Sequence, residues 1–121
     1  MNKLTKKEEE IMNLFWGNGP MFVRDILELY EEPKPALTTI STMVRILESK
    51  DFVGHKAYGN TYQYFPLVSR EDYMKNSLFG VISDYFENSY LKAVSALVKE
   101  EKISIEELKD LIAQIEAGKE A

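Results

Sequence analysis

The sequence predicts a mostly α-helical protein with one small β-hairpin, and three observations lead to this fold class. Three segments within residues 5–49 space their apolar side chains at the intervals of amphipathic helices. Residues 52–66 contain two short runs of β-branched and aromatic residues on either side of Gly59-Asn60, a dipeptide suited to a tight turn. From Ser69 onward the helical spacing is nearly continuous. We therefore expect three helices, a hairpin and then further helices.

The first two helices are marked by clear start and stop signals. Thr5 and Glu8 have the spacing of a capping box, which predicts a helix over about 5–16 with Trp16 in the core. Residues 17–20, Gly-Asn-Gly-Pro, end it. A short second helix is expected from Val23 to Tyr30, before the proline-containing segment 31–35.

The third helix, over about 37–49, has an unusual exposed face. One arc of its helical wheel is apolar and consists of Leu37, Ile40, Met43, Val44 and Leu47. The opposite arc consists of Thr38, Ser41, Thr42, Arg45 and Ser49, with Thr39 and Ile46 on the border. Surface helices usually carry Glu and Lys at such positions, because these residues favour helix formation. A slim, hydrogen-bonding face is instead typical of a helix that enters a DNA major groove.

Two of these hydroxyl residues differ in whether they could have a structural role instead of contacting DNA. Thr38 either contacts DNA or caps its own helix, whereas Thr42 has no such structural role and is the better candidate for reading DNA. In the hairpin, Tyr62 and Tyr64 are expected to pack against the third helix. Three short helices followed by a hairpin give the order of a winged helix-turn-helix domain, to which we assign residues 1–68.

Residues 69–121 are expected to form two or three amphipathic helices, which are too few to bury their apolar faces against one another. We expect them to pair with the same helices of a second chain rather than to cover the first domain. A homodimer would also combine two DNA-binding heads on two half-sites. The candidate dimerisation residues share this apolar spacing and are Leu78, Ile82, Phe86, Leu91, Val94, Leu97, Val98, Leu108, Leu111 and Ile112.

The formal net charge of −5 is unusual for a protein that binds nucleic acid. The acidic excess lies mainly in the second half: residues 1–68 contain eight basic and nine acidic side chains, and residues 69–121 contain seven and eleven. Within residues 34–56 the basic side chains predominate, with Lys34, Arg45, Lys50, Lys56 and His55 against Glu48 and Asp51. The first half therefore permits DNA binding.

Several functional classes are excluded or disfavoured. The chain has no cysteine, which rules out disulfides, thiolate metal sites and a cysteine nucleophile. Its one histidine, His55, has no positioned acid partner, and no glycine-rich phosphate loop is present. We expect no enzymatic activity, no metal and no cofactor. Neither a signal peptide nor an apolar run of about 18 residues is found, so we expect a cytoplasmic protein that does not insert into a membrane.

Six stretches together resemble one known family: residues 4–12, 15–16, 19–20, 23–26, 38–44 and 62–69. They resemble the penicillinase-repressor family, which includes methicillin-resistance repressors and repressors of copper-transport operons. The resemblance covers nearly the whole chain. It implies a winged-helix repressor that dimerises through C-terminal helices and binds a palindromic operator in double-stranded DNA. The residues that it implies for DNA contact are Thr38, Thr39, Ser41, Thr42 and Arg45 on the third helix, Lys56, Tyr58, Asn60 and Thr61 on the wing, and Arg24 at a phosphate.

The chain departs from the family pattern in three places. The family has arginine where Ile46 stands, whereas here Arg45 comes one position earlier, so the operator sequence need not match. The Asn-Phe bond that is cleaved in penicillinase repressors corresponds here to Ala96-Leu97, which leaves open whether a membrane sensor protease is a partner. The cysteine motifs of the copper-responsive members are absent.

Two other functions remain open from the sequence. The winged helix could be a protein-interaction module, because a fold does not determine a function. It could also be a ligand-sensing regulator without proteolytic induction, with an effector bound between the wing domain and the C-terminal helices.

Overall fold

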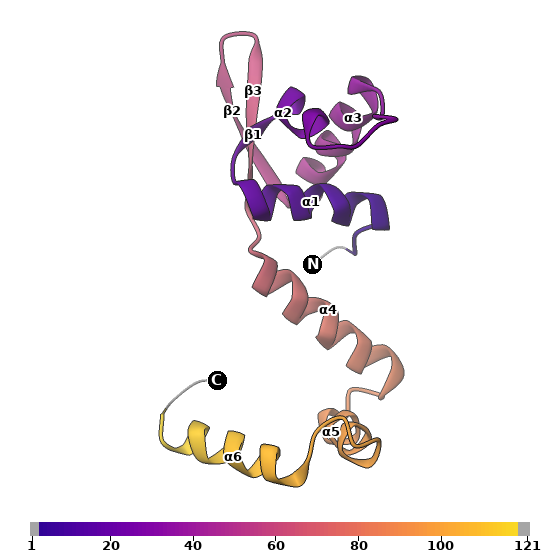
Figure 1. Ribbon diagram of the computed structural model, residues 1–121, viewed down its shortest axis with the longest axis vertical. Helices are drawn as coiled ribbons and strands as arrows, with labels where there is room; N and C mark the ends of the chain where they lie inside the picture. Colours follow the sequence, from indigo (N-terminus) through magenta and orange to yellow (C-terminus); the bar gives the residue numbers. More distant parts are fainter. Residues whose placement is uncertain (1–2, 119–121) are drawn as a thin grey trace. The chain divides into compact units, whose positions relative to one another are not determined.

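The computed structural model describes residues 3–118, and the chain forms two compact units, the first ending at Ser77 and the second beginning at Leu78. It is mostly helical with a small three-stranded antiparallel sheet, which confirms the predicted fold class (Figure 1). In chain order the elements are α1 (Lys6–Asn18), β1 (Met21–Phe22), α2 (Val23–Glu28), α3 (Leu37–Ser49), β2 (Val53–Tyr58), β3 (Thr61–Pro66), α4 (Arg70–Tyr85), α5 (Tyr90–Lys99) and α6 (Ile105–Glu116).

Helix α1 begins with the predicted capping box. The Thr5 side chain accepts a hydrogen bond from the Glu8 N–H (3.2 Å), and the Glu8 carboxylate accepts one from the Thr5 N–H (2.8 Å). The helix continues to Asn18, two residues further than expected, and the side chain of Asn18 donates to the carbonyl of Leu14 (2.8 Å). It ends at Gly19, whose positive φ of 79° suits glycine.

The sheet contains one strand that the sequence did not predict. Strand β1 pairs with β3, placing Met21 opposite Tyr64, and the strand order is β1-β3-β2. Strands β2 and β3 form the predicted hairpin, whose turn holds Gly59 at a φ of 62°. Because β1 has only two residues, it shows no alternating pattern from which it could be recognised. Three helices and this hairpin form the winged helix-turn-helix.

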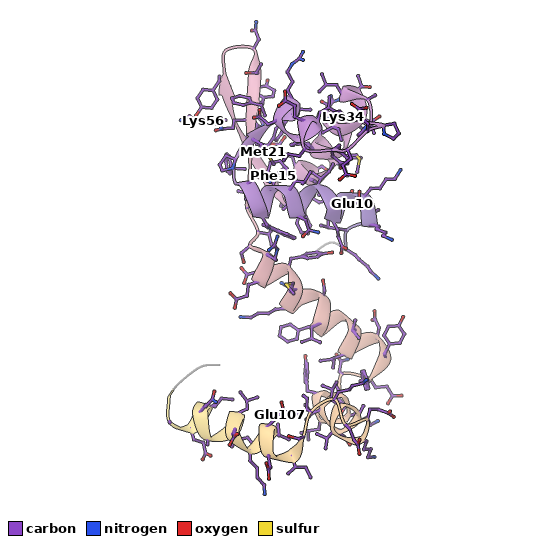
Figure 2. The ribbon with its side chains drawn as sticks, viewed as in Figure 1. Glu10, Phe15, Met21, Lys34, Lys56 and Glu107 are labelled. Atoms are coloured by element: carbon purple, nitrogen blue, oxygen red, sulfur yellow. The ribbon has the colours of Figure 1, made fainter. Side chains whose placement is uncertain are left out.

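The core of the first unit lies between the helices and the base of the hairpin. Phe15 and Met21 belong to it (Figure 2), and its fully buried side chains are Ile11, Met12, Phe15, Ile26, Ile40, Val44, Leu47, Phe52 and Val53. Tyr64 is buried, as expected, but Tyr62 is 49% exposed, so the prediction that both tyrosines pack inward was wrong for Tyr62. Burial decreases along β2 toward the turn, because the hairpin extends beyond the helices (Figure 1).

The first turns of α4 pack within the first unit. The Tyr73 ring packs at a tilt against Trp16 and edge-to-face against Phe52, each at 5.7 Å between ring centroids. Its hydroxyl donates to the Glu9 carboxylate (2.5 Å). Trp16 is only partly buried, and its indole N–H donates to the carbonyl of Val68 (2.8 Å). These contacts attach the start of α4 to α1.

The second unit buries very few of its side chains. Among its described residues, 78–118, only Ile82 is buried. The predicted break after α4 is present, with Glu87 and Asn88 in the left-handed region, and Ser89 caps α5. Ser104 and Glu107 form a reciprocal capping box at α6. Within the described chain, no helix combines the length and the apolar character needed to span a membrane.

Candidate nucleic-acid interface

Helix α3 separates its side chains as the sequence predicted. Ile40, Val44 and Leu47 are buried in the core. On the other side Thr38, Thr39, Thr42 and Arg45 are exposed and Ser41 is half-buried, while Ile46 is 40% exposed. The helix therefore presents a narrow surface of hydroxyls and one guanidinium, beside a single exposed aliphatic side chain.

The hydroxyls of α3 have roles that differ from those expected. The N-cap residue is Ala36, and no side chain caps the helix, so the alternative that Thr38 is a cap was wrong. The sequence indicates no structural role for Thr42, but its Oγ1 donates to the carbonyl of Thr38 (2.9 Å). Arg45 makes a long contact from Nε to the carbonyl of Ser41 (3.4 Å). The Thr42 oxygen can still accept a hydrogen bond, and the terminal nitrogens of Arg45 can still donate.

The wing presents polar side chains around its turn. Lys56 lies on β2 (Figure 2), with its Nζ 5.4 Å from the centroid of the Tyr58 ring. Thr61 donates from its hydroxyl to the carbonyl of Tyr58 (2.9 Å), which stabilises the turn. Together with Asn60, these four predicted wing residues are all exposed.

A hollow of about 640 Å³ brings residues from α2, α3 and the wing together. Five of the predicted DNA contacts line it, namely Arg24, Thr38, Ser41, Asn60 and Thr61. The other five, Thr39, Thr42, Arg45, Lys56 and Tyr58, do not line the hollow. Its remaining walls, which the sequence did not indicate as site residues, are Phe22, Val23, Asp25, Leu37, Tyr62 and Tyr64. They come from four elements, β1, α2, α3 and β3, and no local sequence signal connects them.

Two of the basic residues counted in the sequence are used within the fold. The Lys34 ammonium donates to the carbonyls of Leu27 (3.3 Å), Glu28 (3.1 Å) and Tyr30 (2.6 Å), where it caps the end of α2. The Lys50 ammonium pairs with the buried carboxylate of Glu8 (2.9 Å). The basic side chains that remain on the candidate surface are therefore Arg24, Arg45 and Lys56.

Two side chains near this surface, His55 and Tyr64, lie close to the Glu48 carboxylate. His55 Nδ1 contacts the Glu48 carboxylate, so the expectation that this histidine has no acid partner was wrong. Its imidazole packs at a tilt against the Tyr62 ring, with 4.5 Å between centroids. Burial raises the pKa of Tyr64 above its usual value, and the nearby Glu48 carboxylate raises it further. The Tyr64 phenol is therefore neutral at physiological pH, and its hydroxyl can donate a hydrogen bond.

The predicted dimerisation residues all belong to the second unit. Leu78, Leu91, Val94, Leu97, Leu111 and Ile112 are exposed. Phe86, Val98 and Leu108 are half-buried, and Ile82 is buried. The most exposed of them is Leu91, at 84%.

A model of the penicillinase repressor family matches residues 4–117, which include α1 to α6. No curated protein matches the chain. The family match and the three helices followed by a hairpin agree with each other, because proteins of this family are winged-helix transcriptional repressors. The chain belongs to the penicillinase repressor family.

Proposed function

We propose that this protein acts in the cytoplasm as a homodimeric repressor that binds a palindromic operator in double-stranded DNA. The observation that carries the proposal is the outer surface of α3, where Thr38, Thr42 and Arg45 are exposed. Hydroxyls and a guanidinium can hydrogen-bond to base edges in the major groove. The wing supplies Lys56 and Asn60 for contacts to the flanking backbone.

The second unit supports the dimer. Its described residues bury only Ile82, while Leu78, Leu91 and Ile112 are 56%, 84% and 48% exposed. A unit of this size with so small a core is not expected to be stable alone. Pairing with the same unit of a second chain would cover these side chains and place two α3 helices on two half-sites.

Release from DNA through cleavage would need a change in α5. The Ala96-Leu97 bond lies inside this helix, and the carbonyl of Ala96 accepts a hydrogen bond from the Glu100 N–H (3.0 Å). A protease binds extended backbone, so a membrane sensor protease acting at this bond would require local unfolding of α5. Within a single chain this unit buries little surface, so its partial unfolding would cost little free energy, and pairing in the dimer would raise that cost.

Gel shift with the protein's own upstream DNA tests the proposal. Purified protein should shift a fragment that contains a pseudo-palindrome, and the affinity should fall by about tenfold to a thousandfold between 50 and 200 mM salt. No salt-dependent shift with any fragment would contradict DNA binding and would favour a protein-interaction module.

Arg45→Ala should abolish the shift, because it removes the one guanidinium on the outer surface of α3. Lys109→Ala removes a cation that is also exposed, on α6, and is the control variant, which should bind as the parent does. Circular dichroism and light scattering should show that both variants remain folded and dimeric. An Arg45→Ala protein that binds as tightly as the parent would remove Arg45 from the site.

A further inference from the structure

We propose that the hollow between α2, the start of α3 and the wing turn binds a small aromatic carboxylate, and that this ligand and DNA exclude each other. All residues of this ligand site belong to the first unit. The exclusion of DNA rests on the proposed function.

The walls of the hollow are suited to an aromatic body. Phe22, Leu37 and Tyr62 line it from three different elements, and the buried Tyr64 also lines it. Tyr62 is 49% exposed, although it faces a concave surface. A volume of about 640 Å³ lies within the range of roughly 300–1,000 Å³ that is typical of sites for small molecules. An aromatic ring would cover apolar surface that the first unit leaves open to water.

The same hollow offers a place for one negative charge. Arg24 lines it, and none of the ion pairs in the described chain involves this guanidinium. The first turn of the 13-residue helix α3 also lines it through Leu37 and Thr38, and no side chain caps this helix. Free N–H groups at a helix start attract anions.

One acidic residue, Asp25, also lines the hollow, where its carboxylate accepts a backbone hydrogen bond. The Asp25 carboxylate accepts a hydrogen bond from the N–H of Phe22 (3.0 Å) at the start of α2. The ligand class that matches all of these features is an apolar aromatic ring bearing one carboxylate, with the ring against Tyr62 and the carboxylate near Arg24.

The ligand would occupy residues that the proposed function assigns to DNA. Arg24, Thr38 and Asn60 line the hollow and are also candidate DNA contacts. A carboxylate at the start of α3 would take the place of a DNA phosphate, because both anions need the same donors. Binding of one therefore reduces binding of the other.

Amide chemical shifts measured by nuclear magnetic resonance test the site without any DNA. The probes are 2-naphthoate, its uncharged relative 2-naphthamide, and inorganic phosphate. We expect 2-naphthoate to shift the amides of Leu37, Thr38 and Asn60 saturably, and 2-naphthamide to bind about tenfold more weakly. Phosphate alone should bind more weakly than 2-naphthoate, because it leaves the aromatic walls uncovered.

Arg24→Gln should weaken 2-naphthoate about tenfold and leave 2-naphthamide unchanged, and Arg24→Lys should restore part of the loss. Lys7→Gln removes an exposed cation of α1 that does not line the hollow and should leave the affinity for 2-naphthoate unchanged. Shifts confined to α5 and α6, equal affinity for the acid and the amide, or equal affinity for phosphate and the acid would each overturn the proposal.

The DNA part is measured separately, by adding 2-naphthoate to the protein bound to its shifted fragment. The concentrations of the parent and of Arg24→Gln are first adjusted so that each protein binds the same fraction of the DNA. If 2-naphthoate then releases DNA from the parent but not from Arg24→Gln, the result supports exclusion. Retention of DNA by protein saturated with naphthoate would overturn it. Failure of the protein to bind DNA at all would contradict the proposed function and leave the amide-shift result standing.

Discussion

At the scale of single residues, Glu8 is the one charged side chain that the described part of the chain buries. Its carboxylate accepts from the Thr5 N–H (2.8 Å) and pairs with Lys50 (2.9 Å), which is 26% exposed. Burial by itself raises the pKa of Glu8, but the hydrogen bonds from Thr5 and the interactions with Lys50 outweigh it, so the pKa lies below its ordinary value of 4.5. The ionised carboxylate therefore stabilises the fold.

We predict that Glu8→Gln lowers the free energy of unfolding at pH 7 by about 2 kcal/mol, because Lys50 loses its partner. A lowered pKa in the folded state means that the contribution of Glu8 is fully present above the unfolded pKa and is lost as the pH falls through the folded pKa. The difference in the free energy of unfolding between the parent and Glu8→Gln should thus be constant near neutral pH and should decrease below about pH 5. Urea unfolding followed by the fluorescence of Trp16, the only tryptophan, measures it.

Glu10→Gln is the control for this experiment, because Glu10 is exposed on the same helix. It should change the free energy of unfolding by less than about 0.5 kcal/mol at every pH. A Glu8→Gln protein whose destabilisation is the same at pH 7 and pH 3 would show that the charge of Glu8 is not what stabilises the fold.

Single residues also show what the sequence could not reveal. Glu8 and Lys50 are 42 positions apart, so their pairing depends on how α1 and α3 pack. Lys34 was counted as a basic residue available to DNA, but its partners are backbone carbonyls, which sequence patterns do not identify. The exposed face of α3, by contrast, follows from the periodicity of one segment, so Thr42 and Arg45 could be placed on it.

At the scale of elements, the helix starts were predictable because capping uses neighbours three positions apart. Thr5 with Glu8 and Ser104 with Glu107 both form reciprocal capping boxes. Strand β1 could not be predicted, because its two residues become a strand only through pairing with β3. Tyr62 was misplaced for a related reason: its position two residues from Tyr64 in β3 is suited to burial, but an open hollow separates it from α2 and α3, so it remains 49% exposed.

The two capping boxes give a matched pair of substitutions. Thr5→Ala and Ser104→Ala should each cost about 1 kcal/mol, but in different units. We expect Thr5→Ala to lower the midpoint of the Trp16-detected unfolding transition, and Ser104→Ala to leave it unchanged. Hydrogen exchange should instead become about fivefold faster at the α6 amides of Ser104→Ala. Equal effects of both substitutions on the Trp16 transition would show that the two units unfold as one.

At the scale of the whole molecule, the two units differ in how they bury apolar surface. The first has a core contributed by α1, α2, α3 and the sheet, with Tyr73 of α4 packed on it. The second has Ile82 as its one buried residue within 78–118. Apolar spacing in the sequence indicated the helices of the second unit correctly. It could not show whether these helices meet a second chain, or through which faces, because that depends on contacts outside a single chain.

Leu91 provides the sharpest test of the dimer, because it is 84% exposed within one chain. A charge at this position should cost a single chain little, yet it would be buried unpaired if Leu91 lies between two chains. We therefore predict that Leu91→Glu reduces the mass measured by light scattering at micromolar concentration from twice 14.0 kDa to about 14.0 kDa. Operator affinity should fall about a hundredfold, because the two DNA-binding domains no longer bind as one unit.

Lys102→Glu introduces the same side chain at an exposed site in the turn after α5 and should leave both the mass and the affinity unchanged. A parent protein with a mass near 14.0 kDa would contradict the dimer itself, whereas a dimeric Leu91→Glu protein would place the interface elsewhere on α4 to α6.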